Sequence, residues 1–252
     1  FNNKLNITPG VAVSYFTDFK FHAFPGLDVG YKINDIMRVY GNIGYTYRIP
    51  TYTDLYYNSP TTLGNVDLKP ETALAEELGF VLNYKKLEFT LAGFNRSAKN
   101  LIDFTKENEA DAFSANNIRA VNTLGFETNV AYAFKLFKQN QRVQLGYNFM
   151  NDDIKGLEVP FSRYTLNSAK HHVTGSLDFS FMKNITHFVS YKFVERADGT
   201  SYNVLDGKIS FKIKQVEFSA VINNILDAEY SETNLVPMPE RNFMFSLKYS
   251  LK

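Results

Sequence analysis

The stretch 48–79 reads RIPTYTDLYYNSPTTLGNVDLKPETALAEELG, and it decides the fold class more than any other part of the chain. It lies between two segments in which apolar and polar residues alternate, and it is rich in residues that favour turns. Pro50 and Pro70 fix φ and disfavour helix in the residues before them. The stretch therefore predicts a long, shaped loop between two β-strands, in which these residues act as scaffold.

Alternation with a period of two continues along nearly the whole chain, whereas helical spacing is hard to find. Leu27, Val29 and Tyr31 share one strand face, and Phe243, Phe245 and Leu247 do so near the other end. Charged and amide side chains occupy the opposite face of each strand. We count about twelve strands, several of them near the 9–11 residues that a tilted membrane strand needs.

The connections between the predicted strands alternate in length. Long ones are expected near 49–72, 97–118, 153–169 and 227–240, and short ones near 34–35, 85–86, 182–184 and 214–215. A soluble sandwich has the same two-faced strands but no reason to gather its long loops at one end. Short turns at one end and long loops at the other are typical of outer-membrane barrels. The pattern predicts an all-β fold, a transmembrane antiparallel β-barrel.

Composition narrows the class further. The 252 residues include no Cys and no Trp, but 23 Phe and 16 Tyr, and the net charge is +1. This balance gives no reason to expect nucleic acid as a partner. Absence of Cys excludes a disulfide framework and thiolate metal sites. No run of about 18 apolar residues occurs, which excludes a membrane-spanning helix.

Two sets of short motifs resemble the barrel domain of TonB-dependent receptors. The first set occurs in one order within 48–79: Arg48-Ile49-Pro50, Asp54-Leu55-Tyr56, Gly64-Asn65, Leu68-Lys69-Pro70-Glu71 and Glu77-Leu78-Gly79. The second lies near the C-terminus: Val221-Ile222-Asn223-Asn224-Ile225-Leu226-Asp227, Tyr230 and Pro239-Glu240-Arg241. Glu240 stands where the family usually has Gly.

The resemblance implies a particular place in a larger molecule. Family members have a signal peptide, a segment bound by TonB, a globular plug and a 22-stranded barrel. We expect 1–252 to be a partial β-barrel domain, the C-terminal half, with the plug and N-terminal strands absent. A closed twelve-stranded barrel is the alternative architecture. The implied location is the bacterial outer membrane, with the C-terminus periplasmic, the long loops extracellular, and membrane lipid, TonB and a surface lipoprotein as partners.

The resemblance also implies a function, high-affinity uptake of a scarce nutrient. The wording of the first motif set is most similar to cobalamin receptors of Bacteroidetes type, and ferric siderophore or haem receptors share most of it. Aromatic and basic side chains in the long loops could stack on a planar or macrocyclic ligand. The candidates for ligand contact are Tyr52, Tyr56, Tyr57 and Asn58, with Phe161, Arg163 and Tyr164 in a second loop.

Other functions receive less support from the residues. A passive twelve-stranded pore would have the same polar inner face. An outer-membrane lipase would need a Ser–His pair, but His172 and Ser176 stand roughly 13 Å apart along one strand, too far for proton transfer. The acidic side chains Asp152 and Asp153, or Asp103, Glu107, Glu109 and Asp111, could offer oxygen ligands to Ca²⁺. Solvated loop acids are the simpler reading, so we expect no enzyme, no cofactor and no metal.

Overall fold

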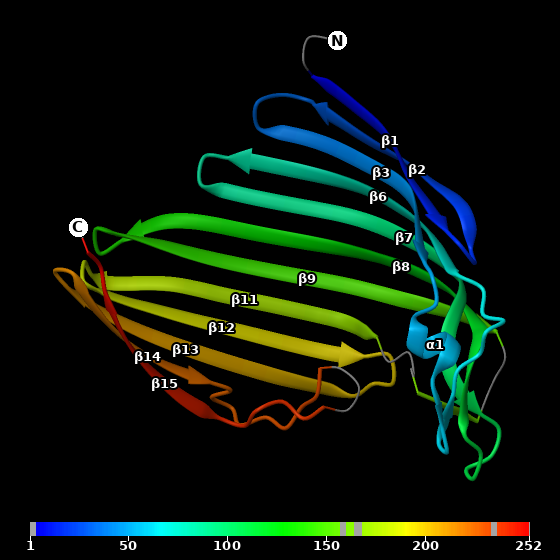
Figure 1. The fold of residues 1–252 in the computed structure, drawn as a ribbon. Coiled ribbons are helices and arrows are strands. Elements are labelled where there is room, and N and C mark those ends of the chain that lie inside the picture. The colour runs from blue at the N-terminus through cyan, green and yellow to red at the C-terminus, as the bar shows by residue number, and fades with distance from the viewer. Residues whose placement is uncertain (1–3, 157–159, 164–167, 233–235, 252) are drawn as a thin grey trace. The chain divides into compact units, whose positions relative to one another are not determined.

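The computed structural model describes residues 4–156, 160–163, 168–232 and 236–251, which fold almost entirely into β-strands (Figure 1). The long strands are β1 (Leu5–Phe16), β2 (Lys20–Lys32), β3 (Met37–Arg48), β6 (Glu71–Tyr84), β7 (Leu87–Lys106), β8 (Phe113–Leu136), β9 (Gln139–Gly156), β11 (Ala169–Met182), β12 (Ile185–Arg196), β13 (Ser201–Ile213), β14 (Val216–Asn223) and β15 (Asn242–Tyr249). Between them lie helix α1 (Tyr52–Tyr56) and the two-residue strands β4 (Asn58–Ser59), β5 (Thr62–Leu63) and β10 (Phe161–Ser162). Within these described ranges, no helix is long and apolar enough to cross a membrane.

The long strands are hydrogen-bonded in sequence order, from β1 to β15, with the short strands attached to the side of this path. Pairs such as β1–β2, β12–β13 and β14–β15 run antiparallel in continuous register. β5 differs, because it pairs in parallel with the start of β8. The prediction of an all-β antiparallel fold with about twelve strands is confirmed.

The chain divides into two compact units, which we describe separately. The first comprises Phe1–Phe80, Ala92–Phe126 and Met150–Asn167, and the second comprises Val81–Leu91, Glu127–Phe149 and Ser168–Lys252.

The connections alternate between long and short more sharply than the sequence indicates. The turns at 85–86, 137–138, 183–184 and 214–215 have two residues each, whereas 49–70 and 224–241 are long. One prediction is wrong: 97–118 is not a loop, because β7 runs to Lys106 and β8 begins at Phe113. Residues 102–105 are buried in succession, so side chains on both faces of β7 are covered there and the alternation disappears.

Each strand of the second unit has an apolar and a polar face. Residues opposite each other in the register share a face, and Leu145↔Gly175, Leu177↔Val189 and Phe218↔Leu247 are such pairs. The apolar side chains are open to the surroundings; Leu145 is 58% exposed and Leu247 66%. Gln144↔Ser176 and Ser190↔Asp206 form the other face, which is polar.

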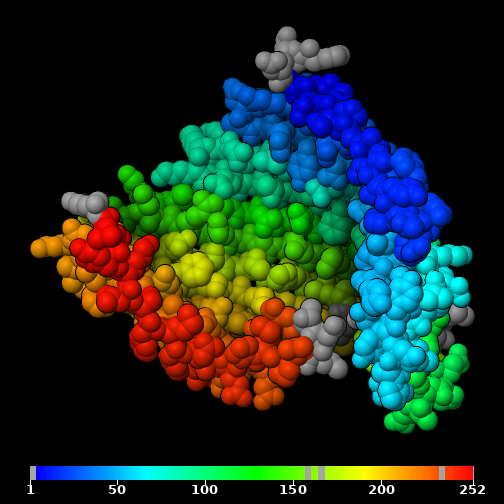
Figure 2. All heavy atoms as spheres, viewed as in Figure 1, coloured from blue at the N-terminus to red at the C-terminus, as the bar shows by residue number. Residues whose placement is uncertain are grey.

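The buried apolar core lies in the first unit, beneath the 49–70 connection. Leu68, Ile102, Phe104 and Ala115 form it, and Leu55 and Phe113 pack against it. In Figure 2 the atoms of this connection, light blue to cyan, lie beside those of the β7–β8 connection, in green. The core therefore fastens the long connection onto the extended ends of β7 and β8.

Candidate ligand-binding surface

Helix α1 begins with a capping box. The Thr51 hydroxyl accepts a hydrogen bond from the Asp54 amide at 3.1 Å, and Asp54 accepts one from the Thr51 amide at 2.8 Å. This arrangement satisfies amides that otherwise lack partners at a helix start. The helix spans five residues, so tertiary contacts rather than propensity must hold it in place.

Helix α1 and the residue after it present three of the predicted contact residues outward. Tyr52 is 80% exposed, and Tyr56 and Tyr57 are each 50% exposed. Tyr52 and Tyr56 stand one helical turn apart, and their ring centroids are 4.8 Å from each other. Asn58 is also exposed and pairs with Leu63 in the β4–β5 hairpin. The structure thus places these four candidates together on one exposed segment.

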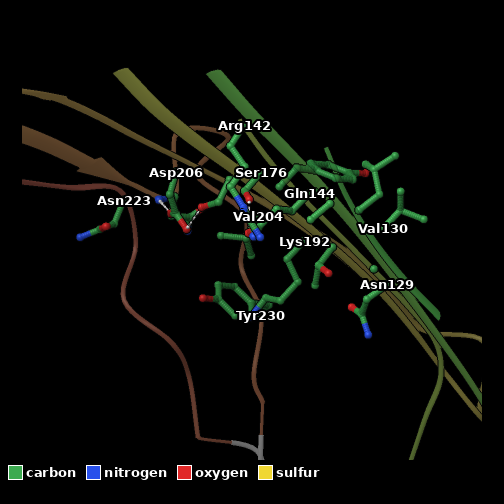
Figure 3. Close-up of a pocket in the computed structure, with 18 of the residues that line it drawn as sticks. Asn129, Val130, Arg142, Gln144, Ser176, Lys192, Val204, Asp206, Asn223 and Tyr230 are labelled. Carbon is green, nitrogen blue, oxygen red and sulfur yellow. Dashed lines mark hydrogen bonds between the residues drawn. The ribbon is translucent and has the colours of Figure 1, made fainter. Parts of the chain in front are cut away.

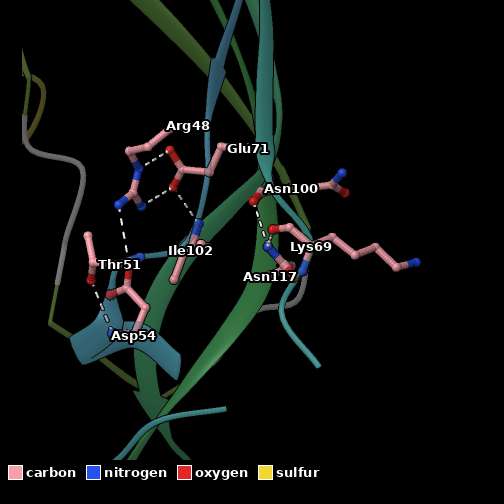
Figure 4. Close-up of polar contacts among 8 residues, drawn as sticks. All are labelled: Arg48, Thr51, Asp54, Lys69, Glu71, Asn100, Ile102 and Asn117. Atoms are coloured by element: carbon pink, nitrogen blue, oxygen red, sulfur yellow. Dashed lines mark hydrogen bonds and ion pairs between the residues drawn. The ribbon is translucent and has the colours of Figure 1, made fainter. Parts of the chain in front are cut away.

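Arg48 anchors this segment to the sheet (Figure 4). Its guanidinium forms two hydrogen bonds to Glu71, at 2.7 and 2.6 Å, and lies 3.4 Å from Asp54. Glu71 also accepts a hydrogen bond from the Ile102 amide at 2.8 Å. Paired N–H···O bonds to one carboxylate fix orientation as well as distance. The network joins the end of β3, the cap of α1, the start of β6 and β7.

Asn117 on β8 makes a second anchor (Figure 4). Its side chain exchanges hydrogen bonds with the backbone of Lys69, at 2.7 and 2.8 Å, and donates to the Asn100 carbonyl at 2.8 Å.

Gly64 packs closely against helix α1, because an added Cβ would stand 2.7 Å from the Leu55 carbonyl carbon. The motif residues that carry the family resemblance therefore shape the loop, as the sequence predicts.

Arg163 lies at the base of the same connection. Its guanidinium donates to the Thr62 hydroxyl at 2.6 Å and lies over the Phe113 and Phe104 rings, 4.7 and 5.6 Å from their centroids. Phe161 in β10 pairs with Lys106 of β7, and the Lys106 ammonium lies over its ring. Arg163 thus binds β5 and both long strands, whereas Tyr164 lies outside the described residues.

Several of the acidic side chains considered as metal ligands already contact other protein side chains or amides, Asp103 among them. Asp103 is 3% exposed, accepts a hydrogen bond from Ser162 at 2.5 Å and lies 3.8 Å from Arg119. Asp111 accepts from the Asn108 amide at 3.0 Å, and Asp152 accepts from Thr123 at 2.5 Å. Among the described residues, no group of three or more acidic or His side chains is gathered as a metal would need.

The second unit contains a cavity of about 730 Å³ on its polar face. Figure 3 shows its wall, to which several strands contribute one or two polar side chains each. Among the lining residues are Arg142, Gln144, Ser176, Lys192, Asp206 and Tyr230. Arg142 also pairs with Glu88 at 2.8 Å. The cavity wall thus carries charges of both signs, on the face where the sequence predicts charged and amide side chains.

The described parts of the 224–241 connection, residues 224–232 and 236–241, contribute Tyr230, Met238 and Pro239 to this wall. Tyr230 stacks on Tyr202 with ring centroids 4.7 Å apart, and the Lys192 ammonium lies over both rings and pairs with Glu232. Arg196 donates to the Ser231 carbonyl at 2.7 Å. Burial raises the pKa of the Tyr230 phenol above its usual range. Sequence reasoning missed these contacts, since their residues lie 28 to 40 positions apart.

His172 and Ser176 offer no catalytic pair. They lie four residues apart on β11, facing the same side. The buried Nε2 of His172 has no hydrogen-bond partner among the described residues. The register keeps the two side chains separated along the strand, as the sequence predicts.

Comparison with known proteins assigns the class. The model of the family described as TonB dependent receptor-like, beta-barrel matches residues 1–225. The chain belongs to this family of TonB-dependent receptor barrels. Family members are transporters and receptors, and the match supports that class rather than a passive pore or a lipase.

Individual relatives are distant. The chain is 24% identical over 238 residues to the vitamin B12 transporter BtuB of Vibrio cholerae serotype O1, covering 88% of this chain and 36% of that protein. It is 23% identical over 249 residues to the hemin receptor of Yersinia pestis, covering 85% and 36%. The siderophore receptor PirA from Acinetobacter baumannii has a similar fold, with a TM-score of 0.77, 17% identity, and 99% and 44% coverage. The chain thus spans about a third to under half of these relatives.

Proposed function

We propose that this chain forms part of the barrel wall of a TonB-dependent transporter in a bacterial outer membrane. The match to the barrel family over residues 1–225 carries the proposal, and the two-faced strands support it. The exposed apolar face of the strands fits the hydrocarbon core of a membrane, because in water it would leave an extended apolar surface in contact with solvent. Residues 1–252 then belong to one barrel domain, with lipid on the apolar face.

The substrate we propose is cobalamin, or else a ferric siderophore or haem. The named relatives include vitamin B12 transporters, a hemin receptor and siderophore receptors. Ligand enters from the long-connection end and contacts Tyr52, Tyr56, Tyr57 and Asn58. Arg163 and Tyr164 are further candidates for ligand contact. Exposed tyrosines suit a flat macrocycle, since aromatic stacking adds roughly 0.5–1.5 kcal/mol per ring beyond burial.

The orientation and partners follow from the same proposal. The long connections face outward from the cell and the C-terminus faces the periplasm. TonB acts through a plug segment carried elsewhere in the protein, and a surface lipoprotein assists at the long loops. The chain itself has no enzymatic role and needs no cofactor.

Uptake by cells carrying the full-length receptor tests the proposal. Cells that depend on external cobalamin should take up cyanocobalamin at nanomolar concentrations, and uptake should stop when TonB is removed. Combined Tyr52→Ala and Tyr56→Ala changes should weaken binding by roughly 5–150-fold, whereas the control Tyr84→Ala, at a short turn, should not. Haemin and ferric siderophores serve as alternative substrates. Steady ion conductance by the purified receptor without TonB would favour the passive pore.

A further inference from the structure

The short turns of the second unit carry a row of lysines. The turns at 85–86, 137–138, 183–184 and 214–215 contain Lys85, Lys86, Lys138, Lys183 and Lys214, and no acidic residue. We call these five residues the lysine rim. All five are exposed, and no ion pair joins them to any residue that the structure describes. The unit's connections at the opposite strand ends, 197–200 and 224–241, contain five acidic residues, Asp198, Asp227, Glu229, Glu232 and Glu240. Of these, Glu232 pairs with Lys192 and Asp227 with Arg241.

Turn geometry alone does not explain these lysines. Lys85, Lys138 and Lys214 have φ values of 55°, 63° and 52°. Gly, Asn and Asp are the residues that this left-handed region favours in two-residue hairpin turns. Lysine occupies these positions against the conformational preference, as does uncharged Phe137 at 53°, so the left-handed geometry does not account for the lysines.

The rim is held as one continuous edge. β7 neighbours β8, β9 neighbours β11, and β12 neighbours β13, so the four turns follow each other along the sheet (Figure 1). Two turn residues accept backbone hydrogen bonds from strands beyond their own hairpins: Lys86 from Ala133 at 3.0 Å, and Asn184 from Lys212 at 2.9 Å. Buried Gln141 donates to the carbonyls of Leu136 and Ser180.

Successive turns of such an edge stand two strand spacings apart, about 10 Å. This separation is close to the Debye length at physiological salt, so the fields of the lysines overlap.

Exposed apolar side chains border the rim. Phe137 is 54% exposed, Phe181 54% and Met182 60%, and the Phe137 ring lies 5.4 Å from that of Phe181. Tyr84 is 48% exposed and lies beneath the Lys85 ammonium, 5.1 Å away. Aromatic rings of this kind settle at the headgroup level of a bilayer, and lysine stems extend from there toward phosphate.

We propose that the lysine rim binds the phosphate groups of anionic phospholipids in the leaflet that faces the short turns. The inference rests on the proposed function, because it requires the apolar face to lie in a membrane. Clusters of four to eight basic residues beside a membrane attract anionic lipid with roughly fivefold stronger association per residue. The acidic connections at the other end repel the same lipids, so the preference is confined to one leaflet.

Electron spin resonance of the purified full-length receptor in phosphatidylcholine vesicles tests the inference. Spin-labelled phosphatidylglycerol should be immobilised at the protein surface several-fold more than spin-labelled phosphatidylcholine in 0.05 M NaCl. The difference should vanish in 1 M NaCl, where the Debye length is about 3 Å. Equal immobilisation of both lipids at low salt would overturn the inference, as would a preference that survives high salt or a preference for lipid A instead.

Variants assign the effect to the rim. Combined Lys86→Gln, Lys138→Gln, Lys183→Gln and Lys214→Gln changes leave only Lys85 of the rim and should remove most of the preference. The four matching Lys→Arg changes should retain it. Lys20→Gln, Lys69→Gln, Lys99→Gln and Lys155→Gln serve as the control set in the first unit and should leave it unchanged. An unaltered preference in the rim variant contradicts the inference. Cyanocobalamin uptake is measured in parallel: uptake without lipid preference overturns only this inference, and lipid preference without uptake overturns only the proposed substrate.

Discussion

Arg48 connects segments that lie up to 54 positions apart in the sequence. Its guanidinium donates hydrogen bonds to Glu71, and Glu71 in turn accepts a hydrogen bond from the Ile102 amide. Glu71 and Asp54 are largely buried, with side chains 15% and 10% exposed. A buried carboxylate that loses a charged partner keeps its desolvation cost without the compensating bond. The Arg48 side chain therefore stabilises the loop that presents the tyrosines.

We expect Arg48→Ala to destabilise the 49–70 connection by about 1–3 kcal/mol, because hydrogen bonds to charged groups contribute in this range. Arg48→Lys should destabilise the connection less than Arg48→Ala but more than the native residue, since an ammonium cannot reproduce the paired hydrogen bonds to Glu71. Amide hydrogen exchange at Leu55 and Ile102 measures the effect, about tenfold faster for each 1.4 kcal/mol. Lys69→Ala is the control, because its backbone makes the contacts with Asn117. Unchanged protection of these amides from exchange in Arg48→Ala would show that Arg48 does not stabilise the connection.

Gly64 is constrained by space. An added Cβ would stand 2.7–2.8 Å from backbone atoms of Leu55 and Tyr56, so Gly64→Ala must displace α1. We expect the variant to expose 57–64 to protease and to weaken ligand binding, because the Gly64 amide also donates to the Tyr57 carbonyl at 2.6 Å. Gly30→Ala, where nothing lies within 4 Å of the added atom, should have neither effect. Equal behaviour of the two variants would show that α1 tolerates displacement.

At the scale of elements, the alternating pattern predicts the strands because one face of each strand differs in polarity from the other. The pattern fails where that difference ends. Residues 102–105 are buried together in the extended part of β7, so they resemble a loop in sequence. The turn at 137–138 contains Phe137 and Lys138, both at positive φ, and carries none of the usual turn residues. Helix α1 is too short to show a period.

The candidate site was predictable only in part. Tyr52, Tyr56 and Tyr57 are exposed in the expected loop, but their role in ligand contact stays a prediction. Arg163 illustrates the limit: its partners Thr62, Phe104 and Phe113 lie 50 to 101 positions away. No local spacing encodes such contacts, because they depend on how β5 pairs with β8.

The two faces of one strand give an element-scale prediction. Leu145 on β9 is 58% exposed on the apolar face, and Ser176 lies on the polar face, paired with the neighbouring Gln144. Leu145→Arg should cost roughly 2–4 kcal/mol if that residue lies near the bilayer midplane. Ser176→Arg, at a matched depth, should cost much less because it enters the polar cavity. Urea titration of the full-length receptor in lipid vesicles measures both, and equal costs would mean that the assigned faces are wrong.

At the scale of the whole molecule, a long strand such as β12 ends at a short turn on one side and at a different connection on the other. β12 has twelve residues, and at about 3.3 Å per residue it extends roughly 40 Å. At a tilt of about 35–45°, that length spans roughly 28–33 Å along the membrane normal, which matches the hydrocarbon thickness of about 30 Å. Lys183 of the lysine rim lies just before β12, and the 197–200 connection lies just after it. Labelling the two ends of β12 therefore shows which end faces the cell exterior.

Cysteine labelling makes this test direct, because the chain has no Cys of its own. Ala197→Cys and Asn184→Cys flank β12, and both positions are exposed. We expect a membrane-impermeant maleimide to label Ala197→Cys in intact cells and Asn184→Cys only after the outer membrane is opened. Leu177→Cys, on the apolar face, should react poorly in both conditions because lipid covers it. Labelling of Asn184→Cys in intact cells, with Ala197→Cys protected, would reverse the orientation and place the lysine rim on the outer surface.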